Sequence, residues 1–261
     1  MPSGRSSYAK LMSMCALSAY RIVIGATLTV TEVPKDLSPK FYLDEALEAI
    51  SRDLADFQDF ESLQAIGIVC LAALECGNVS LLHHFLGLYH TALAKQGFCD
   101  EARWPRNLST VEKEERRRLY WHMYRLEVHT SLIIGHVIRC PELQSAVAYP
   151  TVSDGDSTES TEDSEWLSGW NFITDLYRGL EHLIAYFRFR RMSVPTEDRG
   201  LSTAFLLDYP PQEKILNPLA TALHNLPQRF KEARRMSPDI QRNRCGFQTA
   251  NIVCTYQVHV P

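Results

Sequence analysis

The hydrophobic pattern is most regular between Ser109 and Gly135, where it predicts one long helix. The start, Ser109-Thr110-Val111-Glu112, fits a capping box, in which the serine hydroxyl bonds a first-turn amide and the glutamate reaches back to the cap. The stripe then recurs at helical spacing and is wider than that of an ordinary surface helix. Its positions are Leu119, Met123, Leu126, Thr130 and Ile133/Ile134, with Trp121, Tyr124 and Val128 beside them. Because Gly135 supplies a left-handed cap, we expect about 25 residues of mostly buried helix at the centre of the fold.

Two shorter helices are predicted in the first part of the chain. The stretch from Ser7 to Gly25 carries apolar side chains at helical spacing, which indicates a core helix. Ser38-Pro39 then places a cap residue directly before a proline, the residue favoured at the first helical position. Apolar side chains recur from Leu43 to Phe57 at three- and four-residue steps through a charged background. We therefore expect the second helix to continue as far as Phe57.

A helical hairpin is predicted next. The segment from Glu61 to Cys76 is almost uniformly apolar, too short to cross a bilayer and long enough for a buried helix. It is broken by Gly77-Asn78, and an amphipathic helix follows from Val79 to Gln96. Gly97 is a natural C-terminal cap before a loop at 98–108. Because no second copy of the hairpin recurs at a fixed period, the pattern does not indicate a repeat protein.

An acidic segment follows the long helix and its connector. Residues 151–165, TVSDGDSTESTEDSE, carry six acidic side chains and no basic one, which is typical of a solvated loop. Helical spacing returns from Trp166 to Arg191, which predicts another long helix. Its last turns carry the cations Arg188, Arg190 and Arg191, and we expect them to stabilise the C-terminus of that helix and not to contact nucleic acid. The remaining segments are a loop at 196–211, a helix at 218–235 interrupted near Pro227, and a last helix at 246–258. The prediction is an all-α fold, a multi-helix globular array of one domain, 1–261, around the long central helix.

Composition narrows the classes of function. The chain is 45% hydrophobic and 22% charged, which is ordinary for a soluble globular protein. Its formal charge of -4 lacks the basic balance of a domain that grips a phosphate backbone, so we do not expect direct DNA binding by this chain. The seven cysteines are odd in number, scattered and without a C-x-x-C pair, which indicates reduced thiols. The apolar run from Ile22 to Val30 is shorter than the roughly 18 to 20 residues of a membrane span.

No set of residues nominates a catalytic, cofactor-binding or metal site. His129 stands seven residues from both His122 and His136, and seven-residue steps on a helix separate imidazoles by about 10 Å. Metal ligands on one helix are normally three or four residues apart. The nucleophile-elbow, Walker A, dinucleotide-binding and zinc-protease patterns do not occur in the sequence. We therefore predict structural histidines, no cofactor and no enzymatic activity.

Three consecutive arginines, Arg116 to Arg118, lie in the first part of the long helix. Successive helical residues point about 100° apart, so the three cannot form one flat basic patch. A glutamate stands four residues before two of them, which predicts the intrahelical pairs Glu112–Arg116 and Glu114–Arg118. An alternative is that one arginine turns inward and binds loop carbonyls or a carboxylate with its fork of donors. In both cases a structural role is favoured over contact with DNA or another anion.

The motifs of the long helix and its flanks give the chain a family resemblance. It resembles the middle homology region of fungal zinc-cluster transcription factors, also called the fungal-specific transcription factor domain. The typical run of that family is R-R-x-L/W-W-x-x-Y-x-L-D/E, then a glycine turn and an apolar segment ending in proline. The run is similar to Arg117 to Glu127 (RRLYWHMYRLE), Gly135 and Tyr149-Pro150. Flanking similarities in the order of the family are Leu63 to Gly97, Trp170 to Glu181 (WNFITDLYRGLE) and Phe247 to Thr255 (FQTANIVCT).

The chain also departs from the pattern of the family. His136-Val137 stand where a basic residue and proline are common, and the acidic residues before the closing proline are reduced to Glu142, with neutral residues from Gln144 to Tyr149. The six-cysteine zinc cluster that binds DNA in the family is not found in this sequence. The sequence stops at Pro261, inside a segment that resembles a longer helix. We therefore expect a regulatory domain that is incomplete at both ends.

The resemblance implies control of transcription in the nucleus, with a cytoplasmic fraction left open. Without its own zinc cluster, the chain would act through protein partners, a full-length zinc-cluster factor or a co-regulator, on a metabolic or secondary-metabolite gene cluster. No membrane contact is expected, and a small-molecule effector stays open. The alternative is a helical small-molecule-binding protein or enzyme of a biosynthetic cluster, with a pocket among Trp121, Tyr124, Trp170 and Tyr177. A third alternative, a non-functional remnant, predicts poor solubility because an unfinished last helix leaves apolar surface uncovered.

Overall fold

The computed structural model describes residues 2–26, 38–50, 59–151, 161–192, 212–231 and 240–257. In these ranges the regular secondary structure is helical, apart from one isolated parallel bridge between Asp100 and Ala146. The predicted all-α class is therefore confirmed. The chain divides into two compact units, residues 1–108 with 145–147 and residues 109–144 with 148–261. The organisation of 1–261 as one domain stays a prediction.

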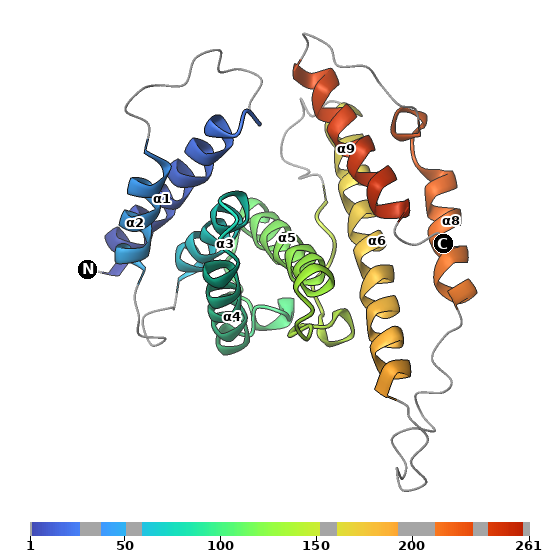
Figure 1. The fold of residues 1–261 in the computed structure, drawn as a ribbon, viewed down its shortest axis with the longest axis horizontal. Coiled ribbons are helices and arrows are strands. Elements are labelled where there is room, and N and C mark those ends of the chain that lie inside the picture. Colours follow the sequence, from blue (N-terminus) through green and yellow to red (C-terminus); the bar gives the residue numbers. More distant parts are fainter. Residues whose placement is uncertain are drawn as a thin grey trace, which may run out of the picture. The chain divides into compact units, whose positions relative to one another are not determined.

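The first unit is built from α1 (Pro2–Val23), α2 (Pro39–Ala49), α3 (Phe60–Glu75) and α4 (Val79–Gln96). Helix α1 packs against α2 and α3, and α3 packs against α4 (Figure 1). Small side chains allow this close approach, because the buried face of α1 consists of alanines and one serine. These residues are Ala9, Ser13, Ala16 and Ala19. The segments that the sequence assigned to the first, third and fourth helices are therefore confirmed as helices.

Caps in the first unit follow the sequence, whereas one helix end does not. Ser38 accepts a bond from the amide of Phe41, and Gly97 takes the left-handed conformation (φ 62°) that its cap role requires. Helix α2 ends at Ala49, since Ile50 is extended (ψ 125°) and only 7% exposed. The predicted continuation to Phe57 is wrong at Ile50, whose extended backbone ends the helix although its side chain is buried, as the periodicity indicated. Residues 51–58 lie outside the described residues.

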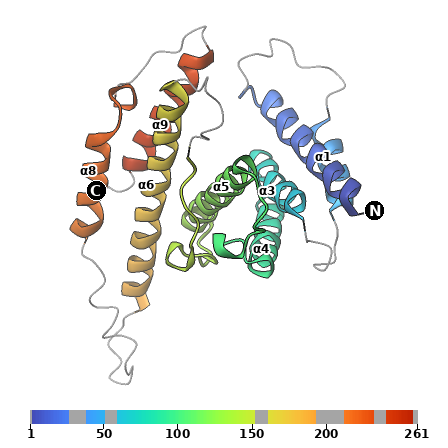
Figure 2. The ribbon, with the colours of Figure 1, turned by 180° about the vertical axis from the view of Figure 1, so that it is seen from behind.

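The second unit contains α5 (Thr110–Ile134), α6 (Thr161–Met192), α8 (Gln212–Asn225) and α9 (Ile240–Gln257), with short 3-10 turns η3 (Glu142–Gln144) and η4 (Gln228–Phe230). Helix α6 packs against α5, α8 and α9, and it runs beside α9 in both ribbon views (Figures 1 and 2). One apolar core joins α6, α8, η4 and α9. Its buried members are Phe172, Ile173, Leu176, Leu219, Leu226, Phe230 and Ile252.

Helix α5 has the predicted limits. The Ser109 hydroxyl accepts from the amide of Glu112, the Glu112 carboxylate accepts from the amide of Ser109, and Gly135 caps the other end with φ 86°. Its stripe is buried from Tyr120 to Ser131, but the last turn is not. Ile133 is 66% exposed and Ile134 is 39% exposed, so their assignment to the buried stripe is wrong. At this end of the helix the neighbouring elements make polar contacts, such as that of Arg188 with the carbonyl oxygen of Ser131. They leave the side chains of Ile133 and Ile134 exposed.

The acidic segment is partly helical. Helix α6 begins at Thr161, so the predicted loop at 151–165 is wrong for residues 161–165 and the helix starts five residues before Trp166. The sequence has acidic residues in these first turns, and acidic residues are favoured near the start of a helix by the helix dipole. Residues 152–160 lie outside the described residues, as does the predicted loop at 196–211.

The last two helices begin earlier than their apolar patterns indicated. Helix α8 starts at Gln212 and contains Pro218 in its interior, where a start at Pro218 was expected. The predicted interruption near Pro227 is confirmed, because α8 ends at Asn225 and η4 follows. Helix α9 starts at Ile240, six residues before Gly246. In α9 the residues from Gln241 to Arg244 are polar and carry no periodic signal, so the pattern placed that start too late. In α8 the apolar pair Ile215-Leu216 precedes Pro218, at which the prediction began.

Candidate functional site

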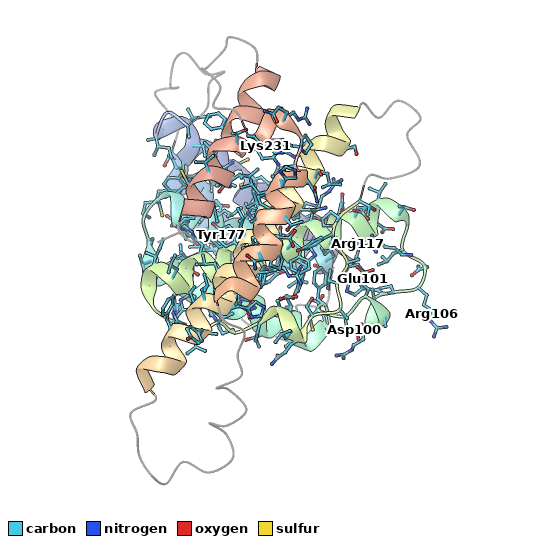
Figure 3. The ribbon with its side chains drawn as sticks, turned by 90° about the vertical axis from the view of Figure 1, so that its right-hand side faces the viewer. Asp100, Glu101, Arg106, Arg117, Tyr177 and Lys231 are labelled. Carbon is cyan, nitrogen blue, oxygen red and sulfur yellow. The ribbon has the colours of Figure 1, made fainter. Side chains whose placement is uncertain are left out.

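The first anchor of the site is a buried carboxylate near the start of α5. Glu114 is 3% exposed and accepts three bonds, from the amide of Thr151 (2.7 Å), the hydroxyl of Thr151 (3.0 Å) and Nη1 of Arg117 (2.6 Å). The predicted Glu114–Arg118 pair is therefore wrong, and the inward-turning alternative is met by Arg117 (Figure 3). Arg116 donates to the carbonyl oxygen of Glu112 at 3.0 Å. Glu114 thus ties the end of the connector that follows α5 back to the beginning of the helix.

Aromatic residues of the family-like run hold the same connector. The indole Nε1–H of Trp121 donates to the carbonyl oxygen of Ala148 at 2.9 Å, and its ring meets that of Tyr149 edge to face at a centroid distance of 4.9 Å. Trp121 is 4% exposed and Tyr124 is 2% exposed. Both rings therefore add apolar packing to specific polar contacts.

A polar cluster joins α5, η3 and α6 at the middle of the unit. Glu181 of α6 accepts from the hydroxyl of Tyr124 (2.7 Å) and from the amide of Glu142 (3.1 Å). Arg178, one helical turn before Glu181, donates to Glu142 and to the Tyr149 hydroxyl (2.9 Å). Nε2 of His182 lies 3.3 Å from the other carboxylate oxygen of Glu142. The polar cluster, Tyr124, Glu142, Arg178, Glu181 and His182, fixes the start of η3 against α6.

The electrostatics of the polar cluster follow from these contacts. The hydrogen bonds from His182 and Arg178 lower the pKa of Glu142 to about 2, although its partial burial acts in the opposite direction. The same bond to Glu142 raises the pKa of His182 above its ordinary value, against the effect of burial. Burial, followed by the charge of Glu181, raises the pKa of the Tyr124 hydroxyl. At neutral pH the polar cluster therefore holds an ionised Glu142 and a protonated phenol.

A second buried carboxylate closes the glycine turn after α5. Glu127 is fully buried and accepts three bonds from Arg139, from its amide (2.9 Å), its Nε (3.0 Å) and its Nη2 (3.0 Å). Nε2 of His136 lies 3.4 Å from the Glu127 carboxylate. The bidentate fork of Arg139 is the geometry in which an arginine best compensates a buried carboxylate. The residues after Gly135 are thus held by the ion pair between Glu127 and Arg139. The family that the sequence resembles commonly has a basic residue and a proline at the positions of His136 and Val137.

The C-terminus of α5 is capped from α6. Arg188 donates to the carbonyl oxygens of Ser131 and His136, both at 2.8 Å, and the Ser131 hydroxyl donates to the same His136 carbonyl at 2.7 Å. The sequence predicted that the cations at the end of α6 complement that helix itself. Arg188 instead satisfies carbonyl groups at the end of α5, which is a tertiary contact between elements 52 and 57 residues apart.

The three histidines of the long helix have separate surroundings. Nδ1 of His122 lies 3.4 Å from Arg125, and Nδ1 of His129 lies 3.4 Å from the hydroxyl of Tyr177 (Figure 3). His136 faces Glu127, so the structure does not bring the three imidazoles to one point. Burial lowers the pKa of His129. Among the described residues, no group of three or more His, Cys, Asp or Glu side chains is placed to hold a metal ion.

The aromatic residues proposed for a pocket serve other purposes. The Arg125 guanidinium lies 4.1 Å from the ring centroid of Trp170, a cation–π contact, and burial lowers the pKa of Arg125 to about 10. Trp121 and Tyr124 are packed in the unit interior, and Tyr177 is packed against its apolar core. Of the four residues predicted around one pocket, Trp121 and Tyr124 meet edge to face at a centroid distance of 5.4 Å. Trp170 contacts Arg125, and Tyr177 contacts His129.

The sequence did not predict which residues pair with the charged and polar side chains of α5 and η3. Arg139 and His182 lie in no motif. Arg178 and Glu181 lie in the family-like segment Trp170 to Glu181, but nothing in the local sequence identifies their partners. A usable signal existed at Glu127, which stands three residues after Tyr124 and four after Met123, inside the buried stripe. A charged residue on the buried face of a helix requires a compensating partner. The contacts of Glu114, Trp121, Glu127 and Arg188 described above hold backbone groups in place.

Comparisons with known proteins identify one family. The family model described as "Fungal specific transcription factor domain" matches residues 6–232. A Saccharomyces cerevisiae protein that its name describes as a transcriptional regulatory protein, YJL206C, is 25% identical over 154 residues, and Activator of stress genes 1 of the same yeast is 26% identical over 133 residues. These segments cover 56% and 48% of this chain but 20% and 14% of the relatives, so the chain spans a small part of their length. No solved structure matches this chain.

Proposed function

Because the chain belongs to the fungal specific transcription factor domain family, we propose that it is the regulatory domain of a transcription regulator, acting in the nucleus through protein partners and not by catalysis. The match over residues 6–232, most of the 261 residues, carries the proposal. The names of the two yeast relatives, a transcriptional regulatory protein and an activator of stress genes, support it. In the part of the chain that the structure describes, no helix is long and apolar enough to cross a membrane.

A regulatory role is supported by how the ionisable groups are used. The carboxylates of Glu114, Glu127 and Glu181 are each less than 6% exposed and each accept bonds from fixed donors. Groups that are satisfied in this way hold backbone in place, whereas a proton-transfer catalyst needs a group that reaches substrate. We therefore propose that the polar residues of the site maintain the shape of the domain.

Action through protein, in preference to direct contact with DNA, is supported by the arginines. Arg117, Arg139, Arg178 and Arg188 direct their guanidinium groups at carboxylates or carbonyl oxygens of the second unit. The formal charge of the whole chain is -4. Phosphate contacts need clustered, accessible cations, so these arginines are poorly placed for a DNA backbone. A full-length zinc-cluster factor or a co-regulator would supply the DNA contact.

Exposed apolar side chains around Gly135 are where we propose that a protein partner binds. Leu132 is 44% exposed, Ile133 is 66% exposed and Val137 is 77% exposed, all within six residues. Apolar side chains gathered on a surface are more typical of protein interfaces than of nucleic-acid contacts. The segment is also held firmly, because Arg188 and Arg139 fix the backbone on either side of it.

The proposal is tested by fusing the 261-residue chain to a heterologous sequence-specific DNA-binding domain and measuring a reporter gene with the matching operator. We expect the fusion to change reporter expression relative to the DNA-binding domain alone. Retention of the purified, unfused chain by DNA in a sequence-specific manner would contradict action through partners. A fusion that folds and enters the nucleus yet leaves the reporter unchanged would contradict the regulatory role.

A pair of matched variants tests the partner surface in the same assay. Ile133→Asp with Val137→Asp introduces charge into the exposed segment, and we expect it to abolish the effect on the reporter without lowering the free energy of unfolding by more than about 0.5 kcal/mol. The control is Val111→Asp at the other end of α5, where the side chain is 59% exposed. The control should behave as the unmodified fusion. Equal effects of the two variants would place the partner elsewhere.

A further inference from the structure

The second unit contains a pocket of about 430 Å³ between α8, η4 and α9. Its floor is formed by Phe230 and Ile252, each only 1% exposed and both members of the apolar core. Its walls are the aliphatic side chains of Ala220, Leu223 and Val253. The volume lies within the roughly 300 to 1,000 Å³ typical of small-molecule sites, and the lining is mostly apolar, as such sites are.

The polar side of the pocket carries one cation, Lys231, beside the imidazole of His224. Among the described residues that line the pocket there is no acidic side chain. Nζ of Lys231 donates one bond to the carbonyl oxygen of His224 at 2.5 Å (Figure 3). An ammonium group has three N–H donors, so two remain after this bond. The bond fixes the ammonium group beside an apolar cavity, which is the arrangement that selects an amphipathic anion.

We propose that this pocket binds a small apolar monocarboxylate, with its hydrocarbon part against Phe230 and Ile252 and its carboxylate on Lys231. A second carboxylate on the ligand would find no second lysine or arginine among the described lining residues, so the pocket favours one carboxylate over two. An uncharged ligand of the same shape would bury the same apolar area and lose the charge-assisted bond. The site goes beyond the regulatory role and does not depend on it, because binding is a property of the purified chain.

The probes are octanoate and 1-octanol, which have the same chain length and differ in charge. Isothermal titration calorimetry of the purified 261-residue chain should show one octanoate site, with 1-octanol binding roughly tenfold more weakly. Raising the salt concentration should weaken octanoate and leave 1-octanol unchanged, because only the anion is screened from Lys231. Absence of octanoate binding, or equal affinity for the two probes, would overturn the proposal.

Two variants locate the site, each with a control. Ala220→Phe fills the cavity from an exposed position, and it should weaken both probes at least tenfold, whereas Thr221→Phe on the adjacent exposed position should leave both unchanged. Lys231→Gln keeps a hydrogen-bond donor and removes the charge, and it should reduce octanoate affinity to that of 1-octanol. Lys113→Gln, on exposed α5 surface, is its control. Octanoate affinity unchanged in folded Ala220→Phe would place the ligand elsewhere and overturn the assignment.

Discussion

The indole of Trp121 donates a hydrogen bond of 2.9 Å to the carbonyl oxygen of Ala148, 27 residues further along the chain. Ala148 belongs to the connector between α5 and α6, which has little regular structure of its own. The bond therefore fixes a loop carbonyl from the middle of a buried helix. In the family-like run the tryptophan is thus a positioning residue for the connector as well as a core side chain.

Replacing Trp121 with phenylalanine should separate these two roles. Trp121→Phe keeps an aromatic ring but removes the donor, so we expect a loss of about 1 to 2 kcal/mol in the free energy of unfolding. Trp121→Ala should cost about 3 to 5 kcal/mol, because it also opens a cavity. Urea denaturation measures both. Phe41→Leu, at a side chain 56% exposed, should change stability by less than about 0.5 kcal/mol.

Glu142 should give the unit a pH-dependent stability. Its pKa is lowered to about 2 in the folded chain, so its contribution is present above an unfolded value near 4.5 and is lost as pH falls toward 2. The pKa of His182 is raised, so its contribution is present below about 6.5 and is lost as pH rises through the folded value. Stability from the pair is therefore greatest between about pH 4.5 and 6.5.

Glu142→Gln should flatten both limbs of that profile, because it removes the titrating carboxylate itself and also the hydrogen-bond acceptor that raises the pKa of His182. We expect the difference in unfolding free energy between pH 6 and pH 3 to shrink by roughly 2 kcal/mol relative to the unmodified chain. Urea denaturation at several pH values measures it. Glu115→Gln, an exposed carboxylate on α5, serves as the control and should leave the profile intact. A Glu142→Gln profile parallel to that of the unmodified chain would refute the assignment.

Glu127 and Arg139 should be strongly coupled. Arg139→Ala leaves a fully buried carboxylate without its main cation, and we expect a loss of about 3 to 5 kcal/mol. Combining Arg139→Gln with Glu127→Gln removes both charges, so the double variant should lose less than the sum of the two single variants. A double-mutant cycle by urea denaturation measures the difference. Strict additivity would show that the pair contributes no net coupling.

A side chain at Gly169 should lower the free energy of unfolding, because α6 and α9 approach closely there. A Cβ at this position would lie 2.7 Å from Oε1 of Gln248 and 2.8 Å from the ring of Phe230. We expect Gly169→Ala to cost about 1 to 3 kcal/mol by forcing the buried ring to move. Gly246→Ala is the matched control in α9, since nothing lies within 4 Å of its Cβ position. It should stabilise the chain by up to about 1 kcal/mol, since alanine favours helix.

Local signals were sufficient wherever a helix end is decided by adjacent residues. The capping box at Ser109, the left-handed glycines Gly97 and Gly135, and the proline after Ser38 each act within a few residues. Their short range is why the limits of α4 and α5 are those that the pattern predicts. The pattern failed at Ile50, where apolar spacing runs past the observed end of α2, and at the starts of α8 and α9, which lie before the residues at which the prediction began.

The sequence by itself determined the helical class, the long helix α5 with its caps, and the family to which the chain belongs. Tertiary structure alone decided which charges are buried and with whom they pair. Glu127 finds Arg139 across 12 residues, whereas Glu142 finds His182 across 40, and no local pattern encodes such distances. It also decided that Ile133 is exposed and that Lys231 stands beside a cavity. Helical periodicity sets which way a side chain points, but only the packing of other elements sets what it meets.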